Sequence, residues 1–197
     1  MKRTFDFVMA LSGLILLFPL FLLVGILIYF TDGWPVFFKQ KRIGKNGTPF
    51  QFFKFRSMRV SGSGQTEEFG AGDLSRVTPF GKFLRKTKLD ELPQLMNVVK
   101  GDMSLVGPRP EVGKWVNVYP ERWAKVLSVR PGITDHAALV FRHEEDLLAK
   151  AADPERTYRE VLLPRKLDLY EAYVDQHSLA SDLVLVLKTI YCLFVRK

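Results

Sequence analysis

Two adjacent acids, Asp90 and Glu91, are the first candidates for chemistry, because they directly follow basic residues in a basic chain. Neighbouring residues on a helix point about 100 degrees apart, so the two carboxylates are expected to have different roles rather than to share one proton. If Asp90 caps a helix, Pro93 falls in its first turn, where a missing amide hydrogen costs little. The free N–H groups of that helix end favour a phosphate. The basic residues that strengthen the positive field there are Arg85, Lys86 and Lys88.

Further basic residues surround these acids in the sequence. Arg109 in GDMSLVGPRP and Arg130 in VRPGIT lie in rigid turns, and a guanidinium held in place loses less entropy when it binds phosphate. Upstream, basic residues alternate with aromatic residues; they are Lys39, Lys41, Arg42, Lys54 and Arg56. Taken singly, each could be a solvated or membrane-facing charge, and the two acids could simply complement a helix dipole. A surface of this kind could bind nucleic acid or an anionic bilayer.

The composition argues against several other classes of site. The chain has 197 residues, a formal net charge of +8 and 47% hydrophobic residues, which is enough for about one domain. Its single cysteine, Cys192, cannot form an internal disulfide, so a reduced cytoplasmic environment is expected. The three histidines follow no ligand spacing, and no CxxC, HExxH or GxSxG pattern occurs. Zinc chemistry and a serine or cysteine triad are therefore not expected.

An uncharged segment over residues 7–30 is longer than the roughly 20 residues that a helix needs to cross a bilayer. No small-residue cleavage site follows it, so we expect a retained anchor. Basic residues flank both ends, among them Lys2 and Lys41, and the positive-inside rule therefore places both ends in the cytoplasm. Pro19 near the middle breaks the helical hydrogen bonding and would let the segment dip into one leaflet and return. A kinked single-pass helix is the alternative, because proline is tolerated in membrane helices.

The rest of the chain predicts a mostly helical domain. Residues 35–60 alternate apolar and polar side chains around the turn sequence GKNG, which predicts a short β-hairpin. The stretch Ser61–Asp73 is rich in glycine and serine and predicts a mobile loop. A helix, a turn and a second helix starting near Asp90 are expected over residues 74–101, and an amphipathic helix is expected over residues 180–197. We find no internal repeat and no second domain.

Three motifs together resemble a known family. They are QKRIGKNGTPFQFFKFRSM, LRKTKLDELPQLMNVVKGDMSLVGPRP and VRPGIT, and they follow the proline-broken segment. In this combination, which covers nearly the whole chain, the sequence resembles the bacterial sugar transferases, the monotopic polyprenol phosphate phosphoglycosyl transferases. The resemblance implies an α+β, mostly helical monotopic membrane protein with amphipathic surface helices and a small β-hairpin. Residues 1–33 would form the re-entrant membrane helix, and residues 34–197 the cytoplasmic catalytic domain on the membrane surface.

The same resemblance implies an activity. Such enzymes transfer sugar 1-phosphate from a UDP-sugar to undecaprenyl phosphate and release UMP, with Mg²⁺ and a covalent phosphosugar intermediate. They act on the cytoplasmic face of the bacterial inner membrane, at the first membrane step of exopolysaccharide, lipopolysaccharide or related synthesis. At matching positions Asp90 would be the nucleophile and Arg85 would assist it. Asp90 and Glu91 would be the magnesium ligands, with Glu91 either binding the ion or supporting its site. The residues expected to bind phosphate or nucleotide are Lys54, Arg109, Arg42, Arg56 and Arg130. With this resemblance, binding to nucleic acid is not expected.

The sequence also departs from the family pattern. Phe18 precedes Pro19 where serine is common, which removes a possible hydroxyl hydrogen bond at the helix break. After VRPGIT the chain continues with DHAALVFRHEEDLLA instead of the frequent glycine, so no sugar identity is carried over. Two rival classes stay open: a non-catalytic membrane scaffold, and a phosphatidyl transferase, which would need several membrane spans and more aspartates. The donor sugar, the pathway and the oligomeric state are not predicted.

Overall fold

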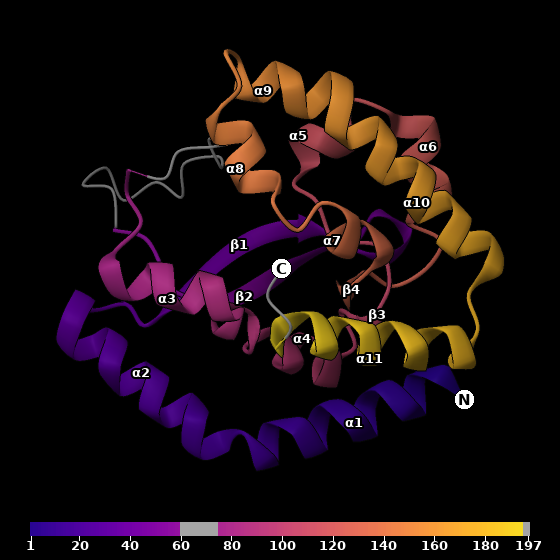
Figure 1. Cartoon of the computed structure of the whole chain (residues 1–197). Helices are drawn as coiled ribbons and strands as arrows, with labels where there is room; N and C mark the ends of the chain where they lie inside the picture. The colour runs from indigo at the N-terminus through magenta and orange to yellow at the C-terminus, as the bar shows by residue number, and fades with distance from the viewer. Residues whose placement is uncertain (60–74, 195–197) are drawn as a thin grey trace.

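The computed structural model describes residues 1–59 and 75–194 of the chain. In this part, helices pack around two small two-stranded sheets, as Figure 1 shows. The predicted α+β class and the predominance of helix are therefore confirmed. The loop predicted at Ser61–Asp73 lies outside the described residues.

The uncharged segment forms two helices, α1 (Lys2–Leu16) and α2 (Phe18–Asp32), which meet at Leu17 with a bend of 61°. Pro19 is the second residue of α2, where its missing N–H cannot continue the hydrogen bonding of α1. In Figure 1 the pair forms an arc whose two ends turn toward the rest of the molecule. Within the described residues no single helix meets the length and hydropathy expected of a membrane span, but this bent pair meets them together.

The predicted hairpin is confirmed by β1 (Phe37–Ile43) and β2 (Pro49–Phe55), which pair antiparallel across a tight turn at Lys45–Gly47. One buried aromatic of β2, Phe55, packs with Val24 and Ile28 of α2. Another, Phe52, packs in a cluster with Ala10 of α1. The hairpin therefore fixes its apolar side chains against the arc and leaves its polar side chains for other contacts.

The predicted helix–turn–helix is present, but its second helix begins later than expected. Helix α3 (Pro79–Thr87) ends at Lys88, which has a left-handed φ of 59°. A 3₁₀ turn (Leu89–Glu91) follows, and α4 (Gln94–Lys100) starts only after Pro93. The prediction that Asp90 caps the second helix is therefore wrong, because a separate turn carries both acids.

The turns around Arg109 and Arg130 contain a strand pair that the sequence analysis did not predict. Strands β3 (Ser104–Val106) and β4 (Gly132–Thr134) pair in parallel. Two glycines make this contact possible: a Cβ on Gly132 would lie 2.1 Å from the amide nitrogen of Gly107, and a Cβ on Gly107 would lie 2.4 Å from the carbonyl oxygen of Arg130. Such distances exclude any side chain at these positions, so the two segments are held together at their backbones.

A helical layer covers the hairpin on the side away from the arc (Figure 1). Its core includes the fully buried side chains of Trp123, Leu163 and Leu167. Its elements are α5 (Gly113–Val116), α6 (Pro120–Val126), α7 (His136–Val140), α8 (Glu144–Ala149), α9 (Pro154–Thr157), a π-helical turn (Tyr158–Leu162) and α10 (Leu163–Gln176).

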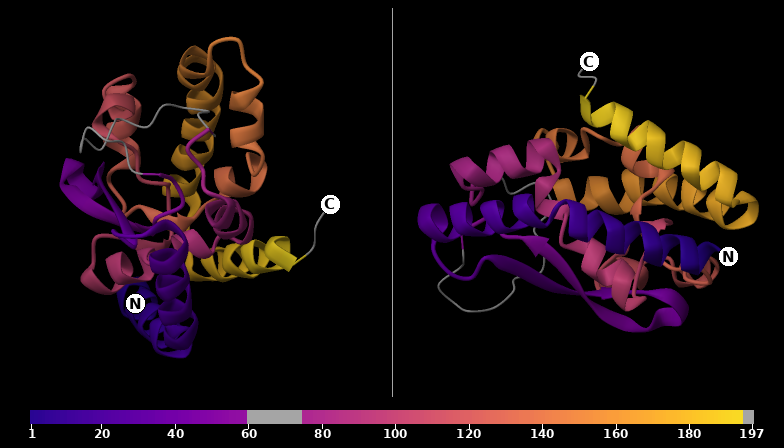
Figure 2. Two further views of the ribbon diagram at one scale, coloured as in Figure 1. Left: turned by 90° about the vertical axis from the view of Figure 1, so that its left-hand side faces the viewer. Right: turned by 90° about the horizontal axis from the view of Figure 1, so that it is seen from below.

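The last helix, α11 (Leu179–Phe194), has its apolar face exposed. Its buried side includes Leu185 and the acid Asp182, which accepts hydrogen bonds from Lys2 of α1 and from Tyr173 of α10. Seen from below, α1, α2 and α11 all lie on the near side of the molecule (Figure 2). The exposed apolar side chains of α11 are Leu179, Leu183, Val184, Leu187, Ile190 and Tyr191.

Candidate active site

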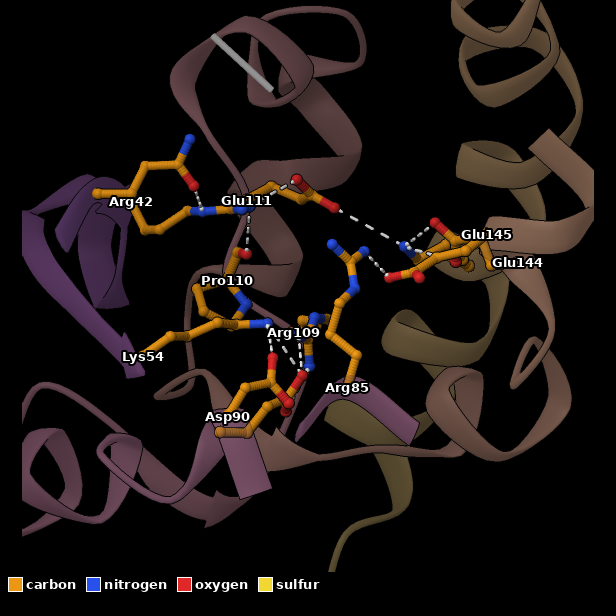
Figure 3. A network of polar contacts seen from close by, with 12 residues as sticks. Arg42, Lys54, Arg85, Asp90, Arg109, Pro110, Glu111, Glu144 and Glu145 are labelled. Atoms are coloured by element: carbon orange, nitrogen blue, oxygen red, sulfur yellow. Dashed lines mark hydrogen bonds and ion pairs between the residues drawn. The ribbon is translucent and has the colours of Figure 1, made fainter. Parts of the chain in front are cut away.

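Three segments that are far apart in the sequence bring the central charged residues together. Strand β2 contributes Lys54, the 3₁₀ turn after α3 contributes Asp90 and Glu91, and the chain just after β3 contributes Arg109. Figure 3 shows Lys54 and Arg109 beside Asp90, and both cations also contact Glu91. The predicted grouping of these four residues is therefore what the structure shows.

Glu91 has both carboxylate oxygens engaged. Its Oε1 accepts from Arg109 Nη2 at 2.7 Å and from Lys54 Nζ at 3.0 Å, and its Oε2 faces Arg109 Nη1 at 3.3 Å. This is the bidentate geometry that an arginine forms with a carboxylate. Burial alone would raise the pKa of Glu91, but the charges of Arg109 and Lys54 hold that pKa well below its usual range. Glu91 is therefore ionised and fixed by its partners.

Asp90 is in a different state, although it is the next residue. Its side chain is buried, its Oδ2 lies 3.7 Å from Lys54 Nζ, and its buried Oδ1 has no hydrogen-bond partner among the described residues. Burial raises the pKa of Asp90, against the charge of Lys54, which lowers it. A buried carboxylate oxygen without a partner is costly and uncommon in a folded protein. Asp90 therefore has an oxygen available for a ligand or a reaction, whereas Glu91 does not.

Arg85 lies near the acids but has another partner. It lies on α3, and its guanidinium donates to Glu145 of α8. Figure 3 shows the Arg85 side chain directed at Glu145. Its positive charge still acts on Asp90, since it lowers the pKa of that carboxyl. Arg85 is thus placed at the edge of the cluster, bonded to the helical segment that follows β4.

Arg42 belongs to a neighbouring group of charges centred on Glu111. Its Nη1 donates to Glu111 Oε2 and to the Pro110 carbonyl, both at 3.1 Å. Because Glu111 follows Arg109 by two residues, this contact ties β1 to the segment that carries Arg109. Arg42 is close enough to Arg109 for the second cation to lower the pKa of Arg42, after burial as the main cause.

Two predicted phosphate ligands are committed to backbone carbonyls elsewhere. Arg56 donates to the carbonyls of Asp32 and Gly33, at the end of α2. Arg130 donates through Nε to the carbonyl of Gly101, at the end of α4, at 2.9 Å. Among the described contacts neither arginine bonds to Asp90 or Glu91, so the structure places both outside the central cluster.

Comparison with known proteins identifies the family of this chain. The sequence matches the bacterial sugar transferase family over residues 1–196. The chain belongs to the bacterial sugar transferase family. It is 38% identical to the exopolysaccharide production protein ExoY of Sinorhizobium fredii, covering 96% of this chain and 83% of that protein. It is 37% identical to UDP-N-acetylgalactosamine-undecaprenyl-phosphate N-acetylgalactosaminephosphotransferase of Aeromonas hydrophila, with 96% and 42% covered. It is 33% identical to UDP-glucose:undecaprenyl-phosphate glucose-1-phosphate transferase of Escherichia coli, with 100% and 41% covered.

The family assignment confirms the predicted family and favours a sugar-phosphate transferase over both rival classes, the non-catalytic scaffold and the phosphatidyl transferase. Arg109 in this bacterial sugar transferase has further neighbours that sequence reasoning missed. Asp135 is buried, and its Oδ1 accepts from the amide of Ala138 at 2.7 Å. Its Oδ2 and the buried hydroxyl of Tyr170 have no hydrogen-bond partner among the residues described. Burial raises the pKa of both groups, and the charge of Arg109 lowers it. Asp135 directly follows VRPGIT, which was the available signal, whereas nothing near Tyr170 in the sequence indicated it.

The predicted magnesium ligands can be tested against the donor atoms. The described residues contain no group of three or more His, Cys, Asp or Glu side chains arranged to hold a metal. Mg²⁺ is commonly held by one or two carboxylates together with waters and substrate phosphates, so two acids make a sufficient protein donor set. Asp90 Oδ1 is free for such an ion, and both oxygens of Glu91 are taken by Arg109. The residues fit the ion through Asp90, and Glu91 could join only if its contact with Arg109 opened.

Proposed function

We propose that this protein transfers sugar 1-phosphate from a UDP-sugar to undecaprenyl phosphate and releases UMP, as the first membrane step in exopolysaccharide synthesis. The observation that carries this proposal is the partnerless buried Oδ1 of Asp90 beside the ionised Glu91–Arg109–Lys54 group. The names of the relatives from Aeromonas hydrophila and Escherichia coli support the substrate class. The name of the Sinorhizobium relative supports the pathway. The names of the Aeromonas hydrophila and Escherichia coli relatives give different donor sugars, so they do not indicate which sugar this protein transfers.

The reaction proceeds in two displacements. An oxygen of Asp90 bonds to the sugar-bearing phosphorus, the bond from this phosphorus to the bridging oxygen breaks, and UMP leaves with the electron pair. An oxygen of undecaprenyl phosphate then bonds to the same phosphorus, and the aspartyl bond breaks to restore the carboxylate. A covalent intermediate suits one shared site, because UMP can leave before the lipid phosphate arrives.

The basic residues provide the electrostatic part of this mechanism. A carboxylate that attacks a diphosphate meets a repelling anion, which fixed cations must offset. Lys54 lies beside both acids, and Arg109 is held in a fixed orientation by Glu91. Mg²⁺ bound at Asp90, with Glu91 as the second candidate ligand, would neutralise phosphate charge and help UMP to leave. Arg85 adds positive charge at the edge of the site.

The N-terminal arc supports a re-entrant placement on the cytoplasmic face of the bacterial inner membrane. At the start of α1, Lys2 pairs with Asp182 at 2.5 Å, and the buried Asp6 accepts from Ser104 Oγ at 2.7 Å. At the end of α2, Thr78 donates to Asp32 Oδ2 at 2.9 Å, and Arg56 holds two carbonyls. Polar contacts therefore tie both ends of the apolar pair to one body, as both ends on one side of a membrane require. The exposed apolar face of α11 provides a further surface for the bilayer.

Product release tests the proposed reaction directly. Purified full-length protein is incubated with undecaprenyl phosphate and a panel of UDP-sugars, and UMP is quantified for each donor. We expect UMP release with one donor or a few related donors, together with an undecaprenyl diphosphate sugar. No UMP from any UDP-sugar, or release of UDP in its place, would contradict the proposal.

A further inference from the structure

A cavity lies between the end of α2 and the start of α3, away from Asp90 and Glu91. It has a volume of about 470 Å³. Its lining residues are Thr31, Asp32, Trp34, Arg56, Arg59, Thr78 and Pro79. Helix α3 has nine residues and separates this cavity from the turn that carries Asp90, which corresponds to about 13 Å along the helix. The cavity is therefore a site distinct from the candidate active site.

Arg56, one of the residues that line this cavity, has an unsatisfied hydrogen-bond donor. Its side chain is only 6% exposed, and its Nη2 donates to the carbonyls of Asp32 and Gly33. Its Nε is buried and has no hydrogen-bond partner in the part of the chain that the structure describes. A charged N–H group without an acceptor is costly in a buried position, so an acceptor from outside the chain would stabilise it. The two carbonyl contacts also fix the orientation of the guanidinium before any ligand binds.

The charge balance of the lining favours an anion. Arg56 and Arg59 are cations, and Asp32 is the single acid of the lining. Asp32 competes less strongly for the cations, since its Oδ2 already accepts a hydrogen bond from the Thr78 hydroxyl at 2.9 Å. Arg59 is exposed, so its side chain is free to reach toward a bound group. Arginine in particular suits phosphate, because its planar fork of N–H groups matches the phosphate oxygens.

The surroundings of the cavity are those of a membrane interface. Trp34 is 76% exposed and lines the cavity, and Phe30 at the end of α2 is 79% exposed. Tryptophan is enriched where lipid headgroups meet the hydrocarbon, with its ring partly in each phase. The re-entrant placement proposed above puts the end of α2 at this depth. Lipid binding at this cavity rests on that placement, which is part of the proposed function.

We propose that this cavity binds the phosphate headgroup of a membrane lipid. Arg56 Nε and the Arg59 guanidinium donate to the phosphate oxygens, and the Trp34 ring packs against the first part of the lipid chain. Such a contact would hold the end of α2 at headgroup depth. The bound group is either the phosphodiester of a bulk anionic phospholipid or the phosphomonoester of the polyprenyl acceptor.

Quenching of Trp34 fluorescence provides the test, because Trp115 and Trp123 are buried in the helical layer. Full-length protein is placed in phosphatidylcholine bilayer discs that contain small amounts of brominated phosphatidylglycerol or, with the same chains, brominated phosphatidylcholine. We expect brominated phosphatidylglycerol to quench at about fivefold lower content, as a favourable basic site near a membrane would produce. The Trp34→Phe variant gives the signal that does not come from Trp34.

Two variants attribute this preference to the cavity. Arg59→Gln should remove most of the preference for phosphatidylglycerol, whereas Lys150→Gln, the same loss of charge at the exposed end of α8, should keep it. Without acceptor, both variants should release one equivalent of UMP from the donor as the wild type does, because this step does not involve a lipid phosphate. A failed transferase would therefore be recognised separately. Equal quenching by the two lipids, no quenching of Trp34, or an unchanged preference in Arg59→Gln would overturn the proposal.

Unlabelled undecaprenyl phosphate separates the two possible sources of the phosphate. If it relieves quenching by brominated phosphatidylglycerol at a much lower content than unlabelled phosphatidylglycerol does, the cavity binds the phosphomonoester of the acceptor. If the two lipids compete equally, the cavity binds bulk anionic phospholipid. Inorganic phosphate at millimolar concentration should compete poorly, and full relief of quenching by it would contradict a lipid ligand.

Discussion

Asp90 and Glu111 are both buried acids beside arginines, yet they differ in how completely they are paired. Glu111 accepts from Arg42 at 3.1 Å and from the Tyr158 hydroxyl, and Lys166 Nζ lies 3.7 Å away. Within residues 1–59 and 75–194, Asp90 has only Lys54 as an ion-pair partner, at 3.7 Å, and one of its oxygens has no hydrogen-bond partner. Burial tends to raise the pKa of both acids; the cations around Glu111 hold its pKa below the usual value, while the pKa of Asp90 stays raised.

This difference separates an acid that stabilises the fold from an acid that is available for chemistry. A fully paired buried acid is expensive to remove, because its partners are left as uncompensated charges. An incompletely paired acid costs free energy in the folded state, and this cost is offset only when a ligand binds. Glu111 should therefore matter mainly for stability, and Asp90 mainly for activity. The predictions below follow from this contrast, from the largest expected effect to the smallest.

Metal removal should have the largest effect if the free oxygen of Asp90 is a magnesium ligand. Chelation of Mg²⁺ should reduce UMP release to background, and added magnesium should restore it, because uncompensated phosphate charge opposes the departure of UMP. The assay is UMP formation from the best donor with and without a chelator. Full activity in excess chelator would show that the cations of the chain are sufficient by themselves.

Glu111→Gln should destabilise the protein by about 3 kcal/mol, because Arg42 and the buried Lys166 lose a charged partner. Glu144→Gln is the matched control: Glu144 is more exposed and contacts Lys166 at 3.3 Å, so its loss should cost about 1 kcal/mol. Denaturant unfolding at pH 7 measures both. Equal stabilities of the wild type and Glu111→Gln would contradict the structural role of Glu111.

The cost of Glu111→Gln should also depend on pH. The pKa of Glu111 is lowered in the folded protein relative to its ordinary value of 4.5. The ionised acid therefore contributes its stability above pH 4.5, and this contribution is lost as the pH falls through the lower, folded pKa. The difference in unfolding free energy between wild type and variant should shrink in that acidic range.

Lys54→Gln should have a smaller effect, which is a shift in the pH dependence of kcat/KM. Asp90 must be ionised to attack, and its pKa is raised above its ordinary value of 3.8, so kcat/KM should fall on acidification at a pH higher than that of an ordinary aspartate. Because the charge of Lys54 lowers this pKa, Lys54→Gln should move the acidic limb to still higher pH. A limb that stays in place in Lys54→Gln would show that another group controls it.

The sequence was sufficient to group the central residues but not to assign every arginine. Lys54, Asp90, Glu91 and Arg109 lie in motifs whose residue types already indicated phosphate chemistry, and the structure brings them together. Arg56 was predicted to bind phosphate in the active site, yet it bonds to the end of α2. Which partner Arg56 binds depends on the carbonyls that the tertiary fold leaves without a donor, such as those at the end of a helix. The residues next to Arg56 in the sequence do not reveal these carbonyls.

Local sequence patterns also could not predict short strands or contacts between residues that are far apart in the sequence. The β3–β4 pair has three residues in each strand, which is too short for a periodic signal. The position of Asp90 depended on the left-handed Lys88, a conformation that few non-glycine residues adopt. Asp135 and Tyr170 come near Arg109 only through the packing of the helical layer. By contrast, the hairpin and the broken N-terminal helix had strong local signals and are present.

A single-turnover experiment with Asp90 tests the central claim most directly. The enzyme, in buffer that contains no undecaprenyl phosphate, is mixed with the accepted UDP-sugar and magnesium. The UMP released is quantified, and the protein is digested for mass spectrometry. The account predicts UMP in an amount equal to the enzyme and a phosphosugar adduct on Asp90. Asp90→Asn should give neither, although its fold should be at least as stable, because the substitution removes a buried and incompletely paired charge. Glu91→Gln should form the adduct slowly. UMP release only when undecaprenyl phosphate is present, together with substantial activity of Asp90→Asn, would show that the lipid phosphate attacks directly and would contradict the role assigned to Asp90.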